Sequence, residues 1–301
     1  MEYSEYEEAT VPICAFVMRN GKEKERGVYF KLSEFKGGMD IQKEKVLMAI
    51  KNIESHYCYN NTVENFSRIS GIPIAFWASE NAIEDFEYKI RIEDISETRI
   101  GMATANNDRF MRLWYEVSID NLGLDYTNRD EAKESGLKWF PYSKGGSYRK
   151  WYGNIEYVVN WQNDGFEIQN FKDEKTGRIR SHNYNLEYIF KPGLTFTAIS
   201  SSLFSCRIMD KSLFGSGGSG ICNISQKNIY PLLGILNSKV AMYLLSCLSM
   251  TMNYEVNNVG KLPFILEYKL NEITEYVKEA IRLSKDDWDS FETSWDFESH
   301  P

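Results

Sequence analysis

The sequence predicts a mixed α+β fold, from its composition and from two kinds of hydrophobic periodicity. The chain has 301 residues, of which 43% are hydrophobic and 26% charged, enough apolar material for one large or two modest cores. Segments in which apolar and polar residues alternate predict strands, and segments with helical apolar spacing predict amphipathic helices. The same composition excludes a disordered or collagen-like chain.

The first predicted elements are two strands joined by a turn. Residues 10–18, TVPICAFVM, form a nearly unbroken apolar run, and the Asn20-Gly21 pair that follows is typical of a turn. Residues 27–32, GVYFKL, roughly alternate, as in a strand with one buried face. The first strand is apolar enough to need cover on both faces, and no predicted element precedes it to supply that cover.

A helical segment is expected next. Asp40 is a candidate N-cap for a helix whose apolar residues keep helical spacing: Val46, Ile50, Ile53 and Tyr57. Residues 66–86 are apolar but interrupted by Gly71 and Pro73, which indicates two short helices with a turn between them.

Residues 97–263 form a second module that is rich in glycine, asparagine and aromatic residues. Frequent glycine-containing turns predict a loop-rich mixed sheet, with strand-like pieces at 157–161 and 194–199. One long helix is expected to close the module, because its apolar residues keep helical spacing over 229–247. Asn228 can cap that helix, and Pro231 falls in its first turn, where the missing N–H does no harm.

Another helix is expected after Pro263, with a second helix start at 284–287. That start precedes three large residues at i, i+3 and i+7: Trp288, Phe291 and Trp295. Large aromatic side chains on an acidic segment need a surface to pack against. They are compatible with a protein-docking surface or, as we favour, with an ordinary intramolecular helix.

The charge of the chain is unevenly distributed. There are 35 basic and 43 acidic residues, a net charge of −8, which by itself argues against a nucleic-acid partner. Residues 138–211, however, hold eleven Lys or Arg against seven Asp or Glu, whereas residues 267–301 hold four against ten. A basic, aromatic-rich middle is therefore followed by an acidic tail.

Several classes of site are not expected. Five cysteines are odd in number, widely spaced and never arranged as CxxC: Cys14, Cys58, Cys206, Cys222 and Cys247. We interpret them as small buried hydrophobes in a reducing compartment. The three histidines lack metal-ligand spacing, so no metal site is expected. The apolar runs fall short of the roughly 20 residues of a membrane span, and the acidic N-terminus is unlike a signal peptide, which predicts a cytoplasmic protein without a membrane partner.

Residues 215–220, GSGGSG, formally match the GxGxxG dinucleotide fingerprint. That fingerprint requires a helix directly after it and an acidic residue about 20 positions further on. After Asp210 the next acidic residue is Glu255, so the required acid is absent. We interpret this segment as a flexible surface loop.

Residues 138–154, KWFPYSKGGSYRKWYGN, are the first candidate DNA-binding cluster. Lys144, Arg149 and Lys150 are assigned to phosphate contacts. Gly145 and Gly146 would shape the loop, and two aromatic residues, Tyr148 and Trp151, would support its walls. The alternative is a hairpin whose aromatic residues are core and whose charges are solvated, and composition does not decide between the two.

Residues 101–117, GMATANNDRFMRLWYEV, are the second cluster. Asparagine and arginine make paired hydrogen bonds to adenine and guanine edges in the major groove. The candidates for base contacts are Asn106, Asn107, Arg109 and Arg112. Asn-Asn-Asp is also the composition of an ordinary turn, which is the favoured interpretation of this cluster taken alone.

Both clusters, together with the strings AISSSLFSCR, LLGILNSKV and SKDDWDSFETSWDF, occur in an order that resembles a known family. The chain resembles the C-terminal portion of PglX, the adenine-specific DNA methyltransferases of bacteriophage-exclusion (BREX) systems, which are related to type IIG restriction-modification enzymes. The resemblance covers nearly the whole chain.

The resemblance implies an organisation in four parts. Residues 1–39 would be the last strands of a Rossmann-like methyltransferase sheet, 40–95 a helical connector, 96–265 a mixed α/β DNA target-recognition domain and 266–301 an acidic helical tail. The partners would be double-stranded DNA and other BREX components.

The resemblance also implies that catalysis lies elsewhere. The family holds the adenine with an Asn-Pro-Pro-Tyr type motif, and none of the seven prolines here adjoins another. No catalytic residue is therefore assigned, S-adenosylmethionine is expected only in the intact parent, and the chain alone is expected to be inactive.

Overall fold

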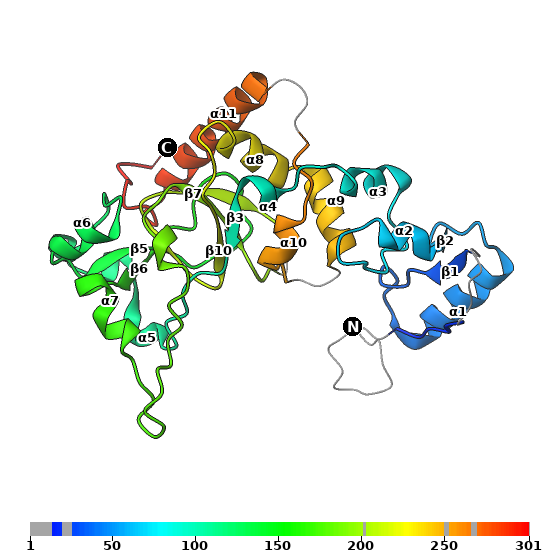
Figure 1. Cartoon of the computed structure of the whole chain (residues 1–301), viewed down its shortest axis with the longest axis horizontal. Helices are drawn as coiled ribbons and strands as arrows, with labels where there is room; N and C mark the ends of the chain where they lie inside the picture. The colour runs from blue at the N-terminus through cyan, green and yellow to red at the C-terminus, as the bar shows by residue number, and fades with distance from the viewer. Residues whose placement is uncertain (1–13, 20–25, 201–202, 250–252, 266–269, 301) are drawn as a thin grey trace. The chain divides into compact units, whose positions relative to one another are not determined.

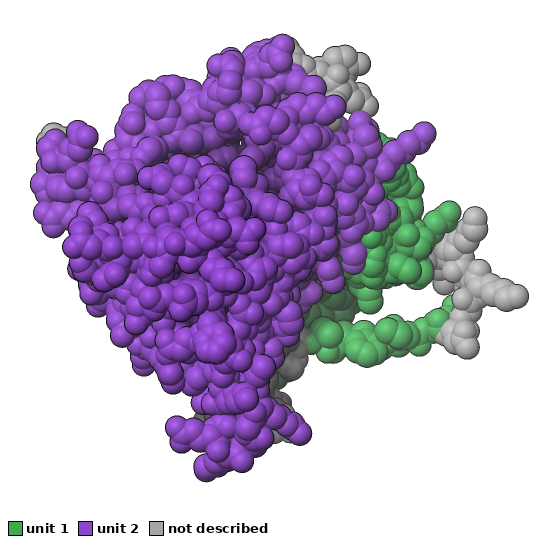
Figure 2. Space-filling view, turned by 60° about the vertical axis from the view of Figure 1, so that its left-hand side comes forward, with its two compact units in different colours: residues 1–87 green, residues 88–301 purple. Residues whose placement is uncertain are grey.

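The computed structural model describes residues 14–19, 26–200, 203–249, 253–265 and 270–300, and the fold is α+β (Figure 1). The chain divides into two compact units, Met1–Glu87 and Tyr88–Pro301 (Figure 2). This division falls inside the segment 40–95 that was expected to be a single connector.

In its described residues, the first unit contains a two-stranded antiparallel sheet and three helices. Its elements are β1 (Gly27–Phe30), α1 (Gly38–Lys51), β2 (Cys58–Asn61), α2 (Val63–Ser67) and α3 (Glu80–Phe86). Strand β1 pairs with β2, from Gly27 opposite Asn61 to Phe30 opposite Cys58.

The predicted first strand is not formed where the structure describes it. Residues 14–19 are irregular and exposed, and Val17 is fully accessible to solvent. A strand needs a neighbouring strand to pair its backbone N–H and C=O groups. Strand β1 pairs with β2 and not with residues 14–19. The predicted turn at 20–21 lies outside the described residues.

Helix α1 begins earlier and ends earlier than the apolar spacing predicted. Its N-cap is Gly37, so Asp40 lies in the first turn and does not cap the helix. Asn52 leaves the helix with extended backbone angles, which places Tyr57 outside it. Tyr57 is nevertheless buried, and its hydroxyl donates to the carbonyl of Lys45 at 3.0 Å.

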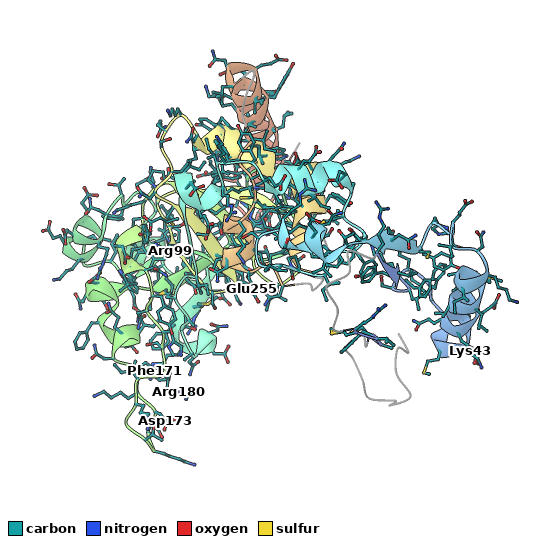
Figure 3. All side chains as sticks on the ribbon, turned by 45° about the vertical axis from the view of Figure 1, so that its right-hand side comes forward. Lys43, Arg99, Phe171, Asp173, Arg180 and Glu255 are labelled. Carbon is teal, nitrogen blue, oxygen red and sulfur yellow. The ribbon has the colours of Figure 1, made fainter. Side chains whose placement is uncertain are left out.

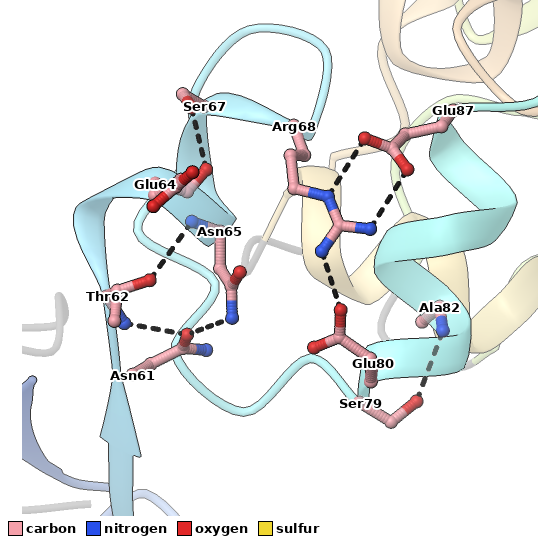
Figure 4. A network of polar contacts seen from close by, with 10 residues as sticks. All are labelled: Asn61, Thr62, Glu64, Asn65, Ser67, Arg68, Ser79, Glu80, Ala82 and Glu87. Carbon is pink, nitrogen blue, oxygen red and sulfur yellow. Dashed lines mark hydrogen bonds and ion pairs between the residues drawn. The ribbon is translucent and has the colours of Figure 1, made fainter.

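Helices α2 and α3 are held by side-chain caps and one arginine (Figure 4). The Thr62 side chain accepts the N–H of Asn65 in α2, and the Ser79 side chain accepts the N–H of Ala82 in α3. Arg68 bonds Glu80 at 2.6 Å and both carboxylate oxygens of Glu87 at 2.9 Å. The Arg68 hydrogen bond keeps the pKa of Glu87 below its usual value. Of the two helices expected over 66–86, α3 is confirmed, whereas α2 begins at Val63 and only its last two residues fall in that segment.

The second unit is built on two four-stranded sheets. The first has the order β3-β10-β7-β8, with all neighbours antiparallel: β3 (Glu97–Arg99), β10 (Gly218–Cys222), β7 (Gly193–Thr197) and β8 (Cys206–Met209). The second has the order β4-β6-β5-β9: β4 (Met111–Leu113), β6 (Tyr157–Asn160), β5 (Trp139–Ser143) and β9 (Leu213–Phe214). Only the β5–β9 pair of this second sheet is parallel.

Short helices connect these strands, and longer helices follow them. The α-helices are α4 (Ile92–Ile95), α5 (Asn107–Phe110), α6 (Arg129–Glu134), α7 (Gln162–Gln169), α8 (Ile229–Leu236), α9 (Lys239–Leu248), α10 (Val256–Gly260) and α11 (Leu270–Asp289). The 3₁₀ turns are η1 (Trp114–Glu116), η2 (Ile119–Asn121) and η3 (Leu186–Tyr188). One core cluster gathers fully buried aromatic residues from the second sheet and from connections: Phe110, Phe140, Trp161, Phe190 and Phe214. Met209 of β8 and Cys222 of β10 join this cluster from the first sheet.

The glycine-rich segment 215–220 is not a flexible surface loop. It joins β9 to β10, and at Gly215 a side chain would collide with the hydroxyl of Tyr142. At Gly218 a Cβ would lie 2.5 Å from the carbonyl oxygen of Ser143. These glycines are needed because the backbones of the two sheets cross in close contact here. A strand, not a helix, follows them, which also argues against a dinucleotide site.

The helix expected over 229–247 is two helices, α8 and α9, bent by 69°. The break falls at Asn237, which is buried, while Ser238 caps α9 by accepting the N–H of Ala241 at 3.1 Å. The Asn237 amide pairs with both backbone groups of Cys206, at 3.0 and 2.9 Å, as a neighbouring strand would. Among the described helices no single one is long and apolar enough to cross a membrane, and the bent pair reaches that composition only jointly.

Helix α11 runs unbroken through the point where a second helix start was predicted. Ser284 lies inside it, and its hydroxyl bonds the carbonyls of Lys150 and Tyr152 instead of capping a helix. Trp288 is buried within the unit, whereas Phe291 is 53% exposed. The first of the three large aromatic residues is therefore covered by the fold itself.

The five cysteines are all free thiols, but they are not all buried. Cys206, Cys222 and Cys247 are buried as expected, whereas Cys58 is only partly buried and Cys14 is exposed. The exposure of Cys14 follows from the missing strand at 14–18. Within the described ranges, no group of three or more His, Cys, Asp or Glu residues is placed to hold a metal ion.

Candidate nucleic-acid interface

The two clusters predicted from the sequence lie at opposite ends of the sheet β4-β6-β5. Helix α5 leads into Met111, which pairs with Val159 near the C-terminal end of β6. Lys144 follows β5 at the other end, where its ammonium group lies 4.6 Å from the ring centroid of Tyr157. The structure therefore does not combine the two clusters into one groove around the glycine pair.

The two asparagines of the second cluster, Asn106 and Asn107, make local hydrogen bonds at the start of α5. Asn106 is the N-cap of α5 and accepts the N–H of Arg109 at 3.0 Å. The amide oxygen of Asn107 accepts the hydroxyl of Thr104 at 2.6 Å. Each amide oxygen thus has one intramolecular donor, and neither NH₂ group has a hydrogen-bond partner in the part of the chain that the structure describes.

Arg109 is the most accessible cation of this cluster. Its side chain is 51% exposed, and it bonds a carboxylate oxygen of Glu167 at 3.0 and 2.7 Å. This hydrogen bond keeps the pKa of Glu167 below its usual value. Arg112, in contrast, donates to the carbonyls of Asp108 and Met111 at 2.5 Å and so braces the start of β4.

Beside Arg109 a hairpin of residues 171–180 projects from the body of its unit, and we call it the finger (Figures 1 and 3). Its strands are joined by a bridge between Lys172 and Ile179 and by the Arg180 N–H donating to the carbonyl of Phe171 at 2.8 Å. Every residue of the finger except Phe171 and Asp173 is exposed.

The finger carries four exposed cations: Lys172, Lys175, Arg178 and Arg180. None of them has a carboxylate partner within hydrogen-bond distance among the described residues. The guanidinium groups of Arg109 and Arg180 both lie over the ring of Phe171, at 5.1 and 5.5 Å from its centroid. A positive, partly aromatic surface therefore runs from α5 onto the finger.

The base of the finger is hydrogen-bonded to the segment that precedes α5. Ala103 and His182 exchange both backbone hydrogen bonds, at 2.7 and 2.9 Å. Next to this junction the rings of His182 and Tyr184 are stacked, with centroids 5.5 Å apart, and both residues are exposed. We call the surface formed by Asn107, Arg109, the finger, His182 and Tyr184 the finger face.

The finger was not among the elements predicted from the sequence, although a signal for it was present. The string FKDEKTGRIR has an Asp three positions before Thr176 and a Gly directly after it, which is the pattern of a side-chain-stabilised turn. Basic residues lie on both sides of that turn. Basic residues flanking a tight turn indicate a projecting cationic hairpin.

The glycine pair of the other cluster is set by close backbone packing. Gly145 is buried with φ +94°, and a side chain there would collide with the carbonyl oxygen of Gly217. The carbonyl of Gly146 accepts the hydroxyl of Thr197 at 3.2 Å, and that hydroxyl accepts a hydrogen bond from the buried Arg207 at 3.1 Å. Both glycines have positive φ, and Gly145 is required because another loop lies against it.

The three residues that follow Tyr148 are held by contacts inside the chain. Arg149 bonds the carboxylate of Asp287 and lies 5.0 Å from the ring centroid of Trp288. The ammonium group of Lys150 donates to the carbonyl of Asn237 at 2.6 Å. Trp151 pairs through its backbone with β8.

The remaining surface of this cluster is small. Tyr148 is 41% exposed, and Lys144 is partly buried against Tyr157. Phe140 and Tyr142 are buried in the core, as the alternative interpretation of this cluster proposed for its aromatic residues. Phosphate contacts by Arg149 and Lys150 stay predictions, and they would have to compete with the bonds just described.

Comparison with known proteins identifies relatives that match almost the whole chain. No protein-family model matches it. It is 39% identical over 293 residues to the adenine-specific methyltransferase PglX of Lacticaseibacillus casei (strain Zhang), a match that covers 95% of this chain and 24% of that protein. The chain belongs to the PglX family. A second member, the adenine-specific methyltransferase BrxX of Escherichia coli O9:H4 (strain HS), is 38% identical over 246 residues, covering 80% of this chain and 19% of that protein.

The relationship to the PglX family extends over both compact units, because a match to 95% of the chain cannot leave either unit out. The chain spans only about a quarter or a fifth of the length of these two relatives. The family expected from the sequence is thereby confirmed.

Proposed function

We propose that this chain is the DNA target-recognition portion of an adenine-N6 DNA methyltransferase that acts in a BREX-type phage-defence system related to restriction-modification. The observation that carries the proposal is the finger face, where four cations without carboxylate partners among the described residues adjoin stacked aromatic rings and Arg109. Cations neutralise phosphates, and planar side chains stack on sugars or bases. Membership of the PglX family supports the same function.

The proposed division of labour leaves the chemistry outside this chain. In the intact parent, a target adenine is flipped out of the duplex and methylated at N6 with S-adenosylmethionine. The GxGxxG segment of this chain does not provide a site for that cofactor, because it is packed against Tyr142 and Ser143. The chain's own residues would clamp the duplex and select the site at which the base is flipped.

The organisation expected from the sequence stays part of this proposal. Residues 1–39 would complete the methyltransferase sheet, 40–95 would connect it, 96–265 would recognise the target and 266–301 would form the acidic helical tail. We place the protein in the cytoplasm, where its DNA substrate and other BREX components are found.

A salt titration tests the proposal. The 301-residue chain and a labelled 30-base-pair duplex are mixed, and the dissociation constant is measured by fluorescence anisotropy between 50 and 200 mM salt. If two of the four finger cations each neutralise one phosphate, log affinity should fall with log salt with a slope of about −1.8. Absence of binding at 50 mM salt with protein at 10 µM would reject the function.

Calorimetry with S-adenosylmethionine tests the second half of the proposal. We expect no heat beyond dilution, because the cofactor site is placed outside this chain. One-to-one binding would show that the cofactor pocket has been misplaced.

A further inference from the structure

We propose that the finger enters the major groove of duplex DNA and reads base edges with Lys175 and Arg178, while Lys172 and Arg180 contact the flanking phosphates. This inference rests on the proposed function and assigns the element that carries it out. Four observations on the finger support it: its width, its reach, its rigidity and its charge.

The width of the finger matches one groove. A two-stranded ribbon has strands about 4.8 Å apart, and the major groove, about 12 Å wide, accepts such a ribbon with its side chains. The minor groove, about 6 Å wide, does not accept it without deformation. The single pair of strands joined at Lys172 and Ile179 therefore fits the major groove.

The reach of the finger is also sufficient. Lys175 at the tip lies four positions after Phe171 at the base, which at about 3.3 Å per residue gives a projection of at most about 13 Å. The major groove is about 8.5 Å deep. Side chains at the tip can thus reach base edges while the base of the finger stays beside the sugar-phosphate backbone.

The tip is rigid before any ligand binds. One carboxylate oxygen of Asp173 accepts the N–H of Lys175 at 3.1 Å and both the N–H and hydroxyl of Thr176 at 2.9 and 3.0 Å. The N–H of Gly177, at φ +66°, donates to the carbonyl of Asp173 at 2.9 Å. A preorganised turn loses little conformational entropy on binding, which favours specific recognition.

The charge of the tip is left available for DNA. The Thr176 backbone hydrogen bond, with its neighbours in the turn, keeps the pKa of Asp173 below its usual value, so this carboxylate is ionised but occupied by turn donors. Lys175 and Arg178 use only their backbone groups in the turn. Arginine and lysine donate to guanine O6 and N7 in the major groove, which is the commonest specific contact.

The base of the finger is fixed to the core. The ring of Phe171 packs edge-on against the fully buried Phe110, with centroids 5.2 Å apart, and the buried Ser181 bonds the carbonyl of Ile168. Because the finger is anchored in this way, the position of its tip relative to α5 is fixed. Asn107 and Arg109 are then placed at the mouth of the groove.

The test compares the wild-type chain with the double variant Lys175→Ala/Arg178→Ala. Because neither side chain takes part in the turn, the variant should fold normally, as checked by circular dichroism. Because these two side chains are assigned to base edges, the variant's affinity for the sequence that the wild type selects should fall about tenfold or more, while its salt slope on a duplex of random sequence should stay close to the wild-type value. The matched control Lys278→Ala/Arg282→Ala removes the same charge from α11 and should leave both the affinity and the slope unchanged.

Two further measurements separate base reading from simple attraction. Sequences selected by the wild-type chain from a randomised duplex pool should share base positions that the finger variant no longer selects. Methyl green, which occupies the major groove, should displace the chain, whereas netropsin, which occupies the minor groove, should not.

Each result decides a separate point. If the wild type binds but the finger variant has the same affinity and selects the same sequences, the finger proposal is overturned and the proposed function stands. A shallower slope with unchanged selected sequences would reduce the finger to a backbone clamp and overturn base reading. Displacement by netropsin alone would overturn the assignment of the groove, and a wild-type chain that binds no duplex would overturn both proposals.

Discussion

The guanidinium group of Arg149 bonds the carboxylate of Asp287, which joins the segment after the glycine pair to helix α11 across 138 positions of sequence. The same side chain donates to the carbonyl of Tyr152 at 3.1 Å and to the carbonyl of Ser284 at 3.4 Å. One cation of the basic middle therefore fastens the acidic tail to the fold. The asymmetry of charge along the sequence is partly neutralised within the molecule.

Replacing Arg149 with Ala should lower the free energy of unfolding by about 1–3 kcal/mol, because a partly buried ion pair and its packing on Trp288 are lost together. Urea unfolding followed by tryptophan fluorescence measures this change. The control is Arg282→Ala, which removes an exposed arginine of α11 and should change stability little. Wild-type stability combined with weaker DNA binding would instead favour the phosphate role predicted from the sequence.

Asn237→Ala should be among the more destabilising single substitutions in the second unit. It removes both hydrogen bonds to the backbone of Cys206 and leaves buried groups unpaired, at an expected cost of about 2–4 kcal/mol. The matched control is Asn228→Ala at the N-cap of α8, where the side chain makes no cap hydrogen bond. Equal losses from the two asparagine variants in chemical denaturation would contradict this explanation of the break between α8 and α9.

Gly145→Ala should destabilise the chain by about 2–4 kcal/mol, since the new methyl group meets the backbone of Gly217 and the residue has positive φ. Gly136 has φ +68°, and no atom lies within 4 Å of the point that a Cβ would occupy, so Gly136→Ala isolates the cost of the backbone angle alone. That cost should be about 1 kcal/mol. Thermal unfolding of the two variants provides the comparison, and a Gly145 variant no less stable than the Gly136 variant would rule out the close approach.

Stability should fall in alkaline solution because of two buried thiols. Burial raises the pKa of Cys206 and of Cys222 to about 12. Unfolded thiols titrate near pH ~8.5, so between about pH 9 and 12 the unfolded chain has lost protons that the folded chain keeps. The free energy of unfolding should then decrease by about 1.4 kcal/mol per pH unit for each thiol.

The contribution of one thiol can be measured by comparing slopes. Cys222→Ala should make the dependence of unfolding free energy on pH between about 9 and 10 shallower by about 1.4 kcal/mol per unit. Cys14→Ala, at an exposed thiol, should leave the slope as it is in the wild type. A Cys222 variant with the wild-type slope would contradict the assignment.

The sequence predicted those elements whose apolar spacing acts locally. Residues 157–161 and 194–199 contain β6 and most of β7, and the apolar stripe after Asn228 does form helices with Pro231 in the first turn. The break at Asn237 was missed because its cause is a pair of hydrogen bonds to a residue 31 positions away. The unbroken course of α11 was missed because Ser284 bonds carbonyls in a distant loop.

The candidate site was predicted less well than the fold, for a physical reason. Composition shows where cations are concentrated, but not which of them have partners inside the fold. Arg149 and Lys150 have such partners, whereas the side chains of Lys175 and Arg178 have none in the described part of the chain. Family resemblance identified the right protein class, while the projecting surface emerged only from the hydrogen bonds of the turn at Asp173.

The turn of the finger is encoded by three residues, Asp173, Thr176 and Gly177, and the side chains between and beside them take no part in it. Positions 175 and 178 are therefore free to vary without disturbing the scaffold. A protein built in this way can acquire a new sequence preference through one or two codon changes. Under the proposed function, such changes would alter the DNA site that is recognised while the rest of the molecule is inherited unchanged.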